Sequence, residues 1–354
     1  GAGVAGFRLV SKYVAPGGPI AEIVSPSPDG KTLVYTSSST GTIGFADITN
    51  PAAPTLLGTT NLSAVTSGFG EPTSVAFSPD GMHVVAVVKD TNNPLSADPG
   101  ALVVVDATTR AIVGQIPVGV GPDSLALTPD GTRAVVAIED EEDEGGNNAA
   151  QARPGSVQVI TINYAAPASS TIETIELSPP FGNMPTDPQP EYVDITKDGK
   201  TAVVSLQENN VFAVIDLETN EVVRYLDAGV SVHARADLLN DRKWNFTQPY
   251  EGQAQPDGTC ILPDQEHFIS ANEGDTSNNV FGGVYAGGRG FSIYHLEEGR
   301  VADSGDALEW AAFRSGAYPD ARSANRGVEP EGCGTGVFGG KDYAFITGER
   351  DASL

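Results

Sequence analysis

The chain has 354 residues and a formal net charge of −26, from 46 acidic and 20 basic residues. Such a charge repels nucleic acid and anionic membrane surfaces, so we expect neither as a partner and favour a metal ion or a cationic partner. The 41 Gly and 25 Pro residues, with apolar residues in short β-branched runs, are typical of an all-β protein with many turns.

The first predicted element is a strand over residues 7–14 (FRLVSKYV), and a repeated hairpin follows it. Each hairpin has a short strand, an Asp-Gly or related turn, and a second strand. In the better copies two more alternating segments follow, so the unit is the four-stranded blade of a β-propeller. The six copies begin at Pro19, Glu71, Gly121, Gln189, Gln255 and Glu329, and the added segments are 42–48, 55–62, 101–107, 111–118, 155–162, 171–177, 211–217 and 221–226.

The repeat predicts one β-propeller domain over residues 1–354, with about six blades visible, five full and one partial. A complete protein could contain seven. Residues 329–354 would start the incomplete last blade, and residues 1–18 would supply a strand that closes it. A C-terminal segment outside this chain, or a second chain, is the alternative way to complete that blade.

Acidic residues recur at one end of the predicted hairpins. In an antiparallel hairpin the start of the first strand and the end of the second lie together, opposite the turn. We expect these acids to converge at the propeller axis, where mutual repulsion would favour a bound hard cation such as Ca²⁺. The expected metal ligands are Glu22, Asp123, Glu139, Glu191, Glu208, Asp257, Glu273, Asp275, Glu331 and Glu349, with amide oxygens from Asn209, Asn210, Asn272 and Asn278.

Two other interpretations of these acids stay open. Arg289, Arg326 and Arg350 could neutralise them without a metal, or each Pro-acid pair could be structural, with the acid accepting a backbone N–H from the next blade. The acidic run 139–144, followed by Gly and Asn, is more typical of a solvated loop than of an ion site.

Other chemistry is weakly represented. The four His residues form no HExxH pair, which disfavours zinc, and no nucleophile-elbow or nucleotide-binding motif stands in a supporting context. Cys260 and Cys333 occupy nearly matching positions in the fifth and sixth copies, so we expect a disulfide; two buried thiols or soft metal ligands are the alternatives. These cysteines and a start without Met favour an exported protein.

Several motifs, in this order, resemble the choice-of-anchor I domain, which is related to mesenchyme-specific cell surface glycoproteins and to YVTN-like propellers. They are AEIV at Ala21, PEY at Pro190, LQENN at Leu206, QPD at Gln255, ANEGD at Ala271, RGFSIY at Arg289, DSGD at Asp303 and EPEG at Glu329. The resemblance implies an extracellular or cell-surface propeller, often in calcium or mineral settings.

Two functions are compatible with these patterns. The first is a secreted or cell-surface calcium-binding module that is not an enzyme and serves adhesion or structure, with a matrix, glycan or protein partner. The second is a metal-dependent phosphoesterase, similar to alkaline phosphatase or phytase, in which Arg289 and Arg350 would clamp the phosphate. Whether the protein is an enzyme is left open by the sequence.

Overall fold

The computed structural model describes residues 6–17, 21–92, 96–141, 153–273, 280–281 and 283–349. The chain divides into two compact units, Gly1–Glu176 and Leu177–Leu354. Nearly all regular structure in the described residues is β-strand, as the Gly and Pro content and the β-branched runs predict.

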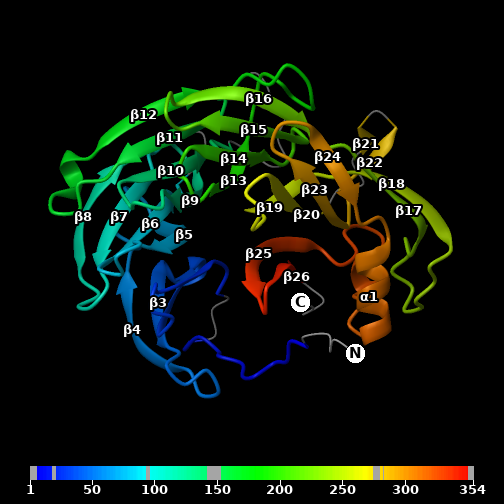
Figure 1. Ribbon diagram of the computed structural model, residues 1–354, viewed down its shortest axis with the longest axis horizontal. Helices are drawn as coiled ribbons and strands as arrows, with labels where there is room; N and C mark the ends of the chain where they lie inside the picture. Colours follow the sequence, from blue (N-terminus) through cyan, green and yellow to red (C-terminus); the bar gives the residue numbers. More distant parts are fainter. Residues whose placement is uncertain are drawn as a thin grey trace. The chain divides into compact units, whose positions relative to one another are not determined.

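The first unit consists of three four-stranded antiparallel sheets, each with its strands in chain order. In Figure 1 they follow one another from blue to green. The strands are β1 (Val24–Pro26), β2 (Thr32–Ser37), β3 (Thr42–Asp47) and β4 (Thr55–Asn61); β5 (Gly70–Phe77), β6 (His83–Asp90), β7 (Ala101–Asp106) and β8 (Ile112–Pro117); β9 (Pro122–Leu127), β10 (Arg133–Ile138), β11 (Ser156–Thr161) and β12 (Thr171–Glu176).

The second unit continues the repeat with two such sheets and a final hairpin. Their strands are β13 (Pro190–Ile195), β14 (Thr201–Leu206), β15 (Val211–Asp216) and β16 (Glu221–Asp227); β19 (Pro256–Ile261), β20 (His267–Asn272), β23 (Gly290–His295) and β24 (Gly299–Asp303); and β25 (Pro330–Phe338) with β26 (Lys341–Gly348). The five full blades and the hairpin of a sixth match the sequence prediction, and the fold is a β-propeller of four-stranded blades.

One sheet of the second unit was not predicted. It has the order β17-β18-β22-β21, with β18 and β22 parallel, and it carries no Asp-Gly hairpin. Its strands are β17 (Val230–Ala236), β18 (Gln248–Gln253), β21 (Val280–Phe281) and β22 (Val284–Ala286), and the helix α1 (Ala307–Ser315) follows β24. These segments interrupt the repeat, so comparison between copies could not reveal them.

In the second blade, the second and third strands are nearly continuous apolar runs whose two faces are both buried. In β6, Val84 and Val88 pack into one core cluster, whereas Val85 and Val87 point to the other face and pack into the next cluster. Successive side chains of a strand alternate between faces, so one valine-rich strand supplies two neighbouring cores.

The Asp-Gly turns have a local structural cause. Gly81 has φ +72°, in the left-handed region that glycine adopts without strain. The Asp80 carboxylate accepts hydrogen bonds from the Ser78 hydroxyl (2.6 Å) and the Met82 N–H (2.9 Å), and these bonds lower the pKa of Asp80. The same two bonds form at Asp29, Asp130 and Asp198, so these aspartates stabilise turns at the end of the hairpin opposite the predicted cation site.

The predicted strand near the N-terminus does not form. Residues 6–17 contain no strand, and Phe7, Leu9, Val10 and Val14 are exposed. The alternating apolar and polar residues predict a strand, but a strand needs a neighbouring strand to satisfy its backbone hydrogen-bonding groups. The expectation that residues 1–18 provide a closing strand is therefore wrong for the described part of that segment. Completion of the last blade by another segment or chain stays a prediction.

Candidate cation-binding site

The Pro-acid pairs mark irregularities at the starts of the first strands. In the third blade, Pro122 and Ser124 face Ile138 and Ala137, which leaves Asp123 as the extra residue of a bulge. Glu331 occupies the same place between Pro330 and Gly332. The register also shifts after Pro190 and after Pro256. Because a bulge redirects the side chain of its extra residue, this recurring feature gives the acids a shared position.

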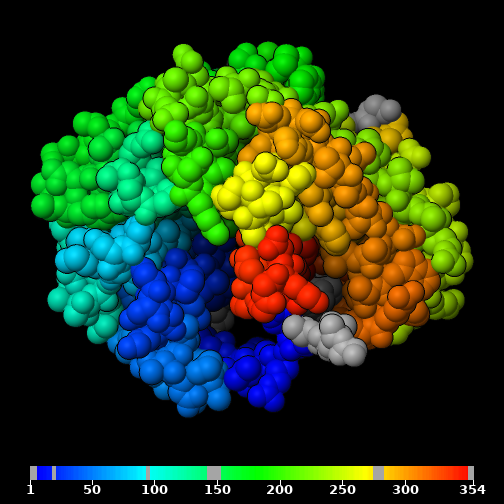
Figure 2. All heavy atoms as spheres, viewed as in Figure 1, coloured from blue at the N-terminus to red at the C-terminus, as the bar shows by residue number. Residues whose placement is uncertain are grey.

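The first strands of successive blades are neighbours within the second unit, as the repeat predicts. A Cβ on Gly258 of β19 would lie 2.4 Å from the Glu331 carbonyl oxygen of β25. The disulfide between Cys260 and Cys333 joins the same two strands, with a Cα–Cα distance of 6.1 Å. In Figure 2 the red atoms of the final hairpin lie against the yellow atoms of the β19–β20 hairpin. Asp257 and Glu331 therefore project from adjacent strands.

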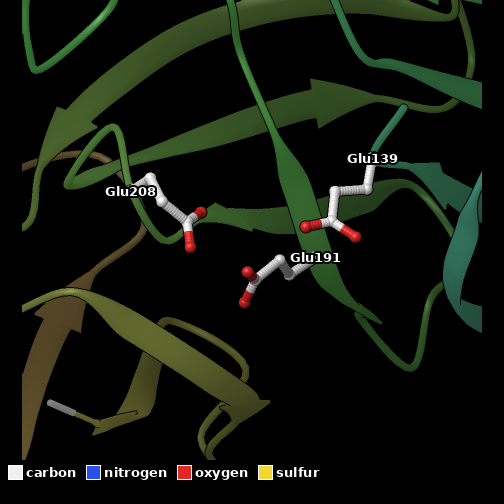
Figure 3. A group of neighbouring side chains, drawn as sticks. All are labelled: Glu139, Glu191 and Glu208. Carbon is white, nitrogen blue, oxygen red and sulfur yellow. The ribbon is translucent and has the colours of Figure 1, made fainter. Parts of the chain in front are cut away.

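The second unit brings together the carboxylates of Glu191 and Glu208. Glu191 lies on β13 and Glu208 follows β14, so the two residues lie at the same end of one hairpin, as expected. A carboxylate oxygen of each lies within 4.8 Å of the other, and Figure 3 shows both groups facing the same space. The figure also draws Glu139, which follows β10 in the first unit and is 8% exposed.

A second acidic group in this unit contains Glu273, Glu329 and Glu349, each with a carboxylate oxygen within 4.8 Å of the others. Arg326 contacts Glu273 at 2.8 Å and Glu329 at 3.3 Å, and Arg322 forms a two-nitrogen pair with the Glu329 carboxylate. Burial raises the pKa of Glu273, while a hydrogen bond from Gln207 and the charge of Arg326 oppose that shift. This group fits the interpretation in which arginine neutralises the acids.

The first unit gathers its acids around a lysine. Burial raises the pKa of Asp123 to about 6, and the charge of Lys89 opposes the shift. The charges of Glu139, Asp123 and Glu71 in turn favour the protonated form of Lys89 and raise its pKa despite burial. Glu22 is exposed and adds a further negative charge that acts on Asp123. Lys89 is thus a counter-charge within this acidic group.

The expected neutral calcium ligands make hydrogen bonds within the protein where the structure describes them. The Asn209 amide donates to three carbonyls, including that of Asn183 (2.8 Å), and accepts the Gln189 N–H (2.9 Å). Asn210 accepts the Gln255 N–H, and Asn272 bonds with Ser270 and Ser292. These amides join loops and strands, and their role as calcium ligands stays a prediction.

The proposed anion clamp at Arg289 is wrong for a similar reason. Arg289 is 1% exposed, its guanidinium lies 3.7 Å from the buried Glu309 carboxylate, and it stacks over Tyr250 at 4.7 Å. A guanidinium held this way cannot reach a substrate in solvent. Arg350, Asp275 and Asn278 lie outside the described residues, as does the acidic run from position 142 onward.

The sequence analysis missed three charged residues that take part in the charge pairing of these acidic groups. Glu329 is fully buried, although the prediction chose Glu331, two positions later in the same motif. Lys89 and Arg322 were also missed. A basic residue beside acidic strand ends, as in the Lys-Asp pair at positions 89–90, was the available signal for an internal counter-charge.

An acid that accepts a backbone N–H from the next blade, as considered for the Pro-acid pairs, is found at Asp194, which the sequence analysis did not name. The Asp194 carboxylate of β13 accepts the Ile261 N–H of β19 at 2.7 Å. The Ser74 hydroxyl of β5 likewise accepts the Leu125 N–H of β9 at 3.3 Å. Burial raises the pKa of Asp194 to about 6. Neighbouring blades within a unit are therefore joined by a side chain in the middle of the first strand.

The choice-of-anchor I domain pattern matches residues 22–285 and 278–354. The chain belongs to the choice-of-anchor I domain family. Membership indicates a surface-associated propeller module, and the disulfide is compatible with that setting. In the described residues, no helix is long and apolar enough to cross a bilayer.

One solved structure supports the fold of this choice-of-anchor I domain, and a second is similar at a lower score. The hydrazine synthase of Kuenenia stuttgartiensis is similar over 98% of this chain and 77% of its own, with 18% identity and a TM-score of 0.56. The β-propeller domain of Cps50 (Swd1) from Myceliophteria thermophila covers 80% of this chain and 86% of its own, with 10% identity and a TM-score of 0.44. No curated protein matches the chain in sequence. At these identities the first likeness shows the fold alone.

Proposed function

We propose that this choice-of-anchor I domain is an extracellular or cell-surface module that binds Ca²⁺ and serves adhesion or structure rather than catalysis. The observation that carries the proposal is the approach of Glu191 and Glu208, whose carboxylate oxygens lie within 4.8 Å of one another. Two oxygens that each lie ~2.4 Å from one ion are at most about 4.8 Å apart, so this spacing fits a shared Ca²⁺.

Electrostatics supports a cation at this pair. Two ionised carboxylates at this separation repel each other, and a cation bound between them removes that repulsion. Calcium accepts six to eight oxygens in flexible geometry, so two carboxylates with backbone carbonyls and water can complete a site. The group around Glu273 is a weaker candidate because Arg322 and Arg326 already supply positive charge there.

Calorimetry of the whole chain with CaCl₂ tests the proposal. The double variant Glu191→Gln, Glu208→Gln keeps the shape of both side chains and removes two charges. We therefore expect its dissociation constant for Ca²⁺ to be at least tenfold larger, a loss of about 1.4 kcal/mol in binding free energy. Glu221→Gln, at an exposed position of β16, is the matched control and should bind as the wild type does. Equal Ca²⁺ affinity in the double variant and the wild type would refute this site.

Among the described residues, Arg289 lies 3.7 Å from Glu309 and is buried, which does not favour its use as the phosphate clamp of a phosphoesterase. Hydrolysis of p-nitrophenyl phosphate with and without chelator separates the two functions. We expect no chelator-sensitive turnover, and robust turnover would replace the binding proposal with an enzymatic one. The same proposal includes a binding partner for the module, which would be a matrix component, a glycan or a protein.

A further inference from the structure

A cleft of about 580 Å³ lies in the second unit at the turn ends of its hairpins, opposite the Glu191 and Glu208 carboxylates. Its volume falls within the ~300–1,000 Å³ of sites that hold small molecules. It is open to solvent and has polar walls from the turns of two blades. The side chains used below are Asp198, Lys200, Glu218, Val223, Arg224 and His295.

Two groups in the cleft have fixed hydrogen-bonding roles. The His295 Nδ1 accepts the N–H groups of Glu297 (3.1 Å) and Glu298 (3.3 Å), so the neutral ring carries its proton on Nε2 and donates there. The Asp198 Oδ1 accepts the Thr196 hydroxyl (2.6 Å) and the Lys200 N–H (2.9 Å), and these bonds lower the pKa of Asp198. Asp198 is therefore a carboxylate acceptor.

Arg224 provides a donor that needs a partner. Its Nη1 donates to the Glu297 carbonyl at 3.0 Å, but its Nε is buried and has no hydrogen-bond partner among the described residues. A buried N–H without an acceptor costs about 1–3 kcal/mol. An oxygen atom brought by a ligand into this wall would remove that cost.

The charge of the walls narrows the class of ligand. Five acidic residues and two basic residues line the cleft, and Lys200 pairs with Glu218 at 3.3 Å. The excess of acids repels a polyanion, whereas the N–H donors of Arg224 and His295 need acceptor atoms that a polycation does not supply. Val223, which is 50% exposed, adds an apolar surface beside these groups. The walls suit an uncharged ligand whose groups both donate and accept.

We infer that this cleft binds a neutral oligosaccharide. A sugar hydroxyl both donates and accepts, so the hydroxyls of one oligosaccharide can accept from Arg224 or His295 and donate to Asp198. The C–H face of a sugar ring can cover Val223. The site is independent of the calcium pair, which lies at the other end of the hairpins.

The test uses the whole chain on an array of neutral oligosaccharides of glucose, mannose and N-acetylglucosamine, with uronic acid and sulfated glycans and a lysine-rich peptide beside them. We expect a neutral oligosaccharide to bind, and calorimetry with it should show at least a tenfold loss in Arg224→Gln. Arg314→Gln, which removes an exposed arginine at the end of α1, is the control for charge and should bind normally.

Glu191→Gln, Glu208→Gln should bind the sugar normally even if it no longer binds Ca²⁺, which separates this inference from the calcium proposal. Thermal unfolding checks that Arg224→Gln folds. Binding of only acidic glycans or of the peptide, no binding of neutral saccharides at millimolar concentration, or unchanged affinity in Arg224→Gln would each overturn the inference.

Discussion

The disulfide between Cys260 and Cys333 gives a prediction whose size follows from the chain. It joins β19 to β25 across 73 residues, and β25 belongs to a two-stranded sheet with a small core. The perturbation is the double variant Cys260→Ala, Cys333→Ala, which leaves no single thiol to exchange. We expect the final hairpin to lose much of its attachment to the second unit.

The magnitude comes from the entropy of the unfolded chain. A cross-link that closes a loop of this length removes about 15 cal/mol/K from the unfolded ensemble, or about 4 kcal/mol at 25 °C. For a unit of about 180 residues, each kcal/mol shifts the melting temperature by roughly 2–4 °C. The double variant should therefore unfold about 10 °C lower than the oxidised wild type.

Calorimetry measures the melting temperature, and amide hydrogen exchange locates the loss. Residues 330–348 should exchange faster in the variant, because the hairpin can open without global unfolding. Wild-type protein treated with a phosphine reductant should match the variant, while the variant itself should not respond. A melting temperature within 1 °C of the wild type, with unchanged exchange in β25 and β26, would refute the reasoning.

Three further predictions concern contacts within single units. Gly258→Ala should destabilise the protein by about 1–3 kcal/mol in urea unfolding, because its Cβ would strike the backbone of β25, whereas Gly334→Ala, with nothing within 4 Å, should cost much less. Asp194→Asn should stabilise the protein by on the order of 1–2 kcal/mol above pH 6. The raised pKa of Asp194 means that the wild type loses stability as pH rises from about 4 to 6, so the gain should vanish near pH 4. Lys89→Met should cost about 1 kcal/mol at pH 7 and less at pH 4.5, where Asp123, with its pKa of about 6, is protonated; an equal cost at both pH values would contradict the counter-charge role.

Hairpins, turns and blade order were predictable because their signals are local. The β-branched run in residues 101–107 and the Asp-Gly pair at positions 80–81 predict a strand and a turn by themselves, and the observed β7 and the Gly81 turn agree with both. The disulfide was predictable because repetition places equivalent residues of adjacent first strands side by side. The closing strand near the N-terminus failed because alternation alone does not supply a partner edge.

The sequence by itself determined the propeller blades and the disulfide, since each depends on a short-range pattern repeated along the chain. Only the tertiary structure decided the partners of charged groups. It buried Arg289 against Glu309, paired Glu329 with two arginines, and joined Asn209 to loop carbonyls. Such pairings join residues far apart in the chain, and their free energy depends on burial and distance, which no local pattern encodes.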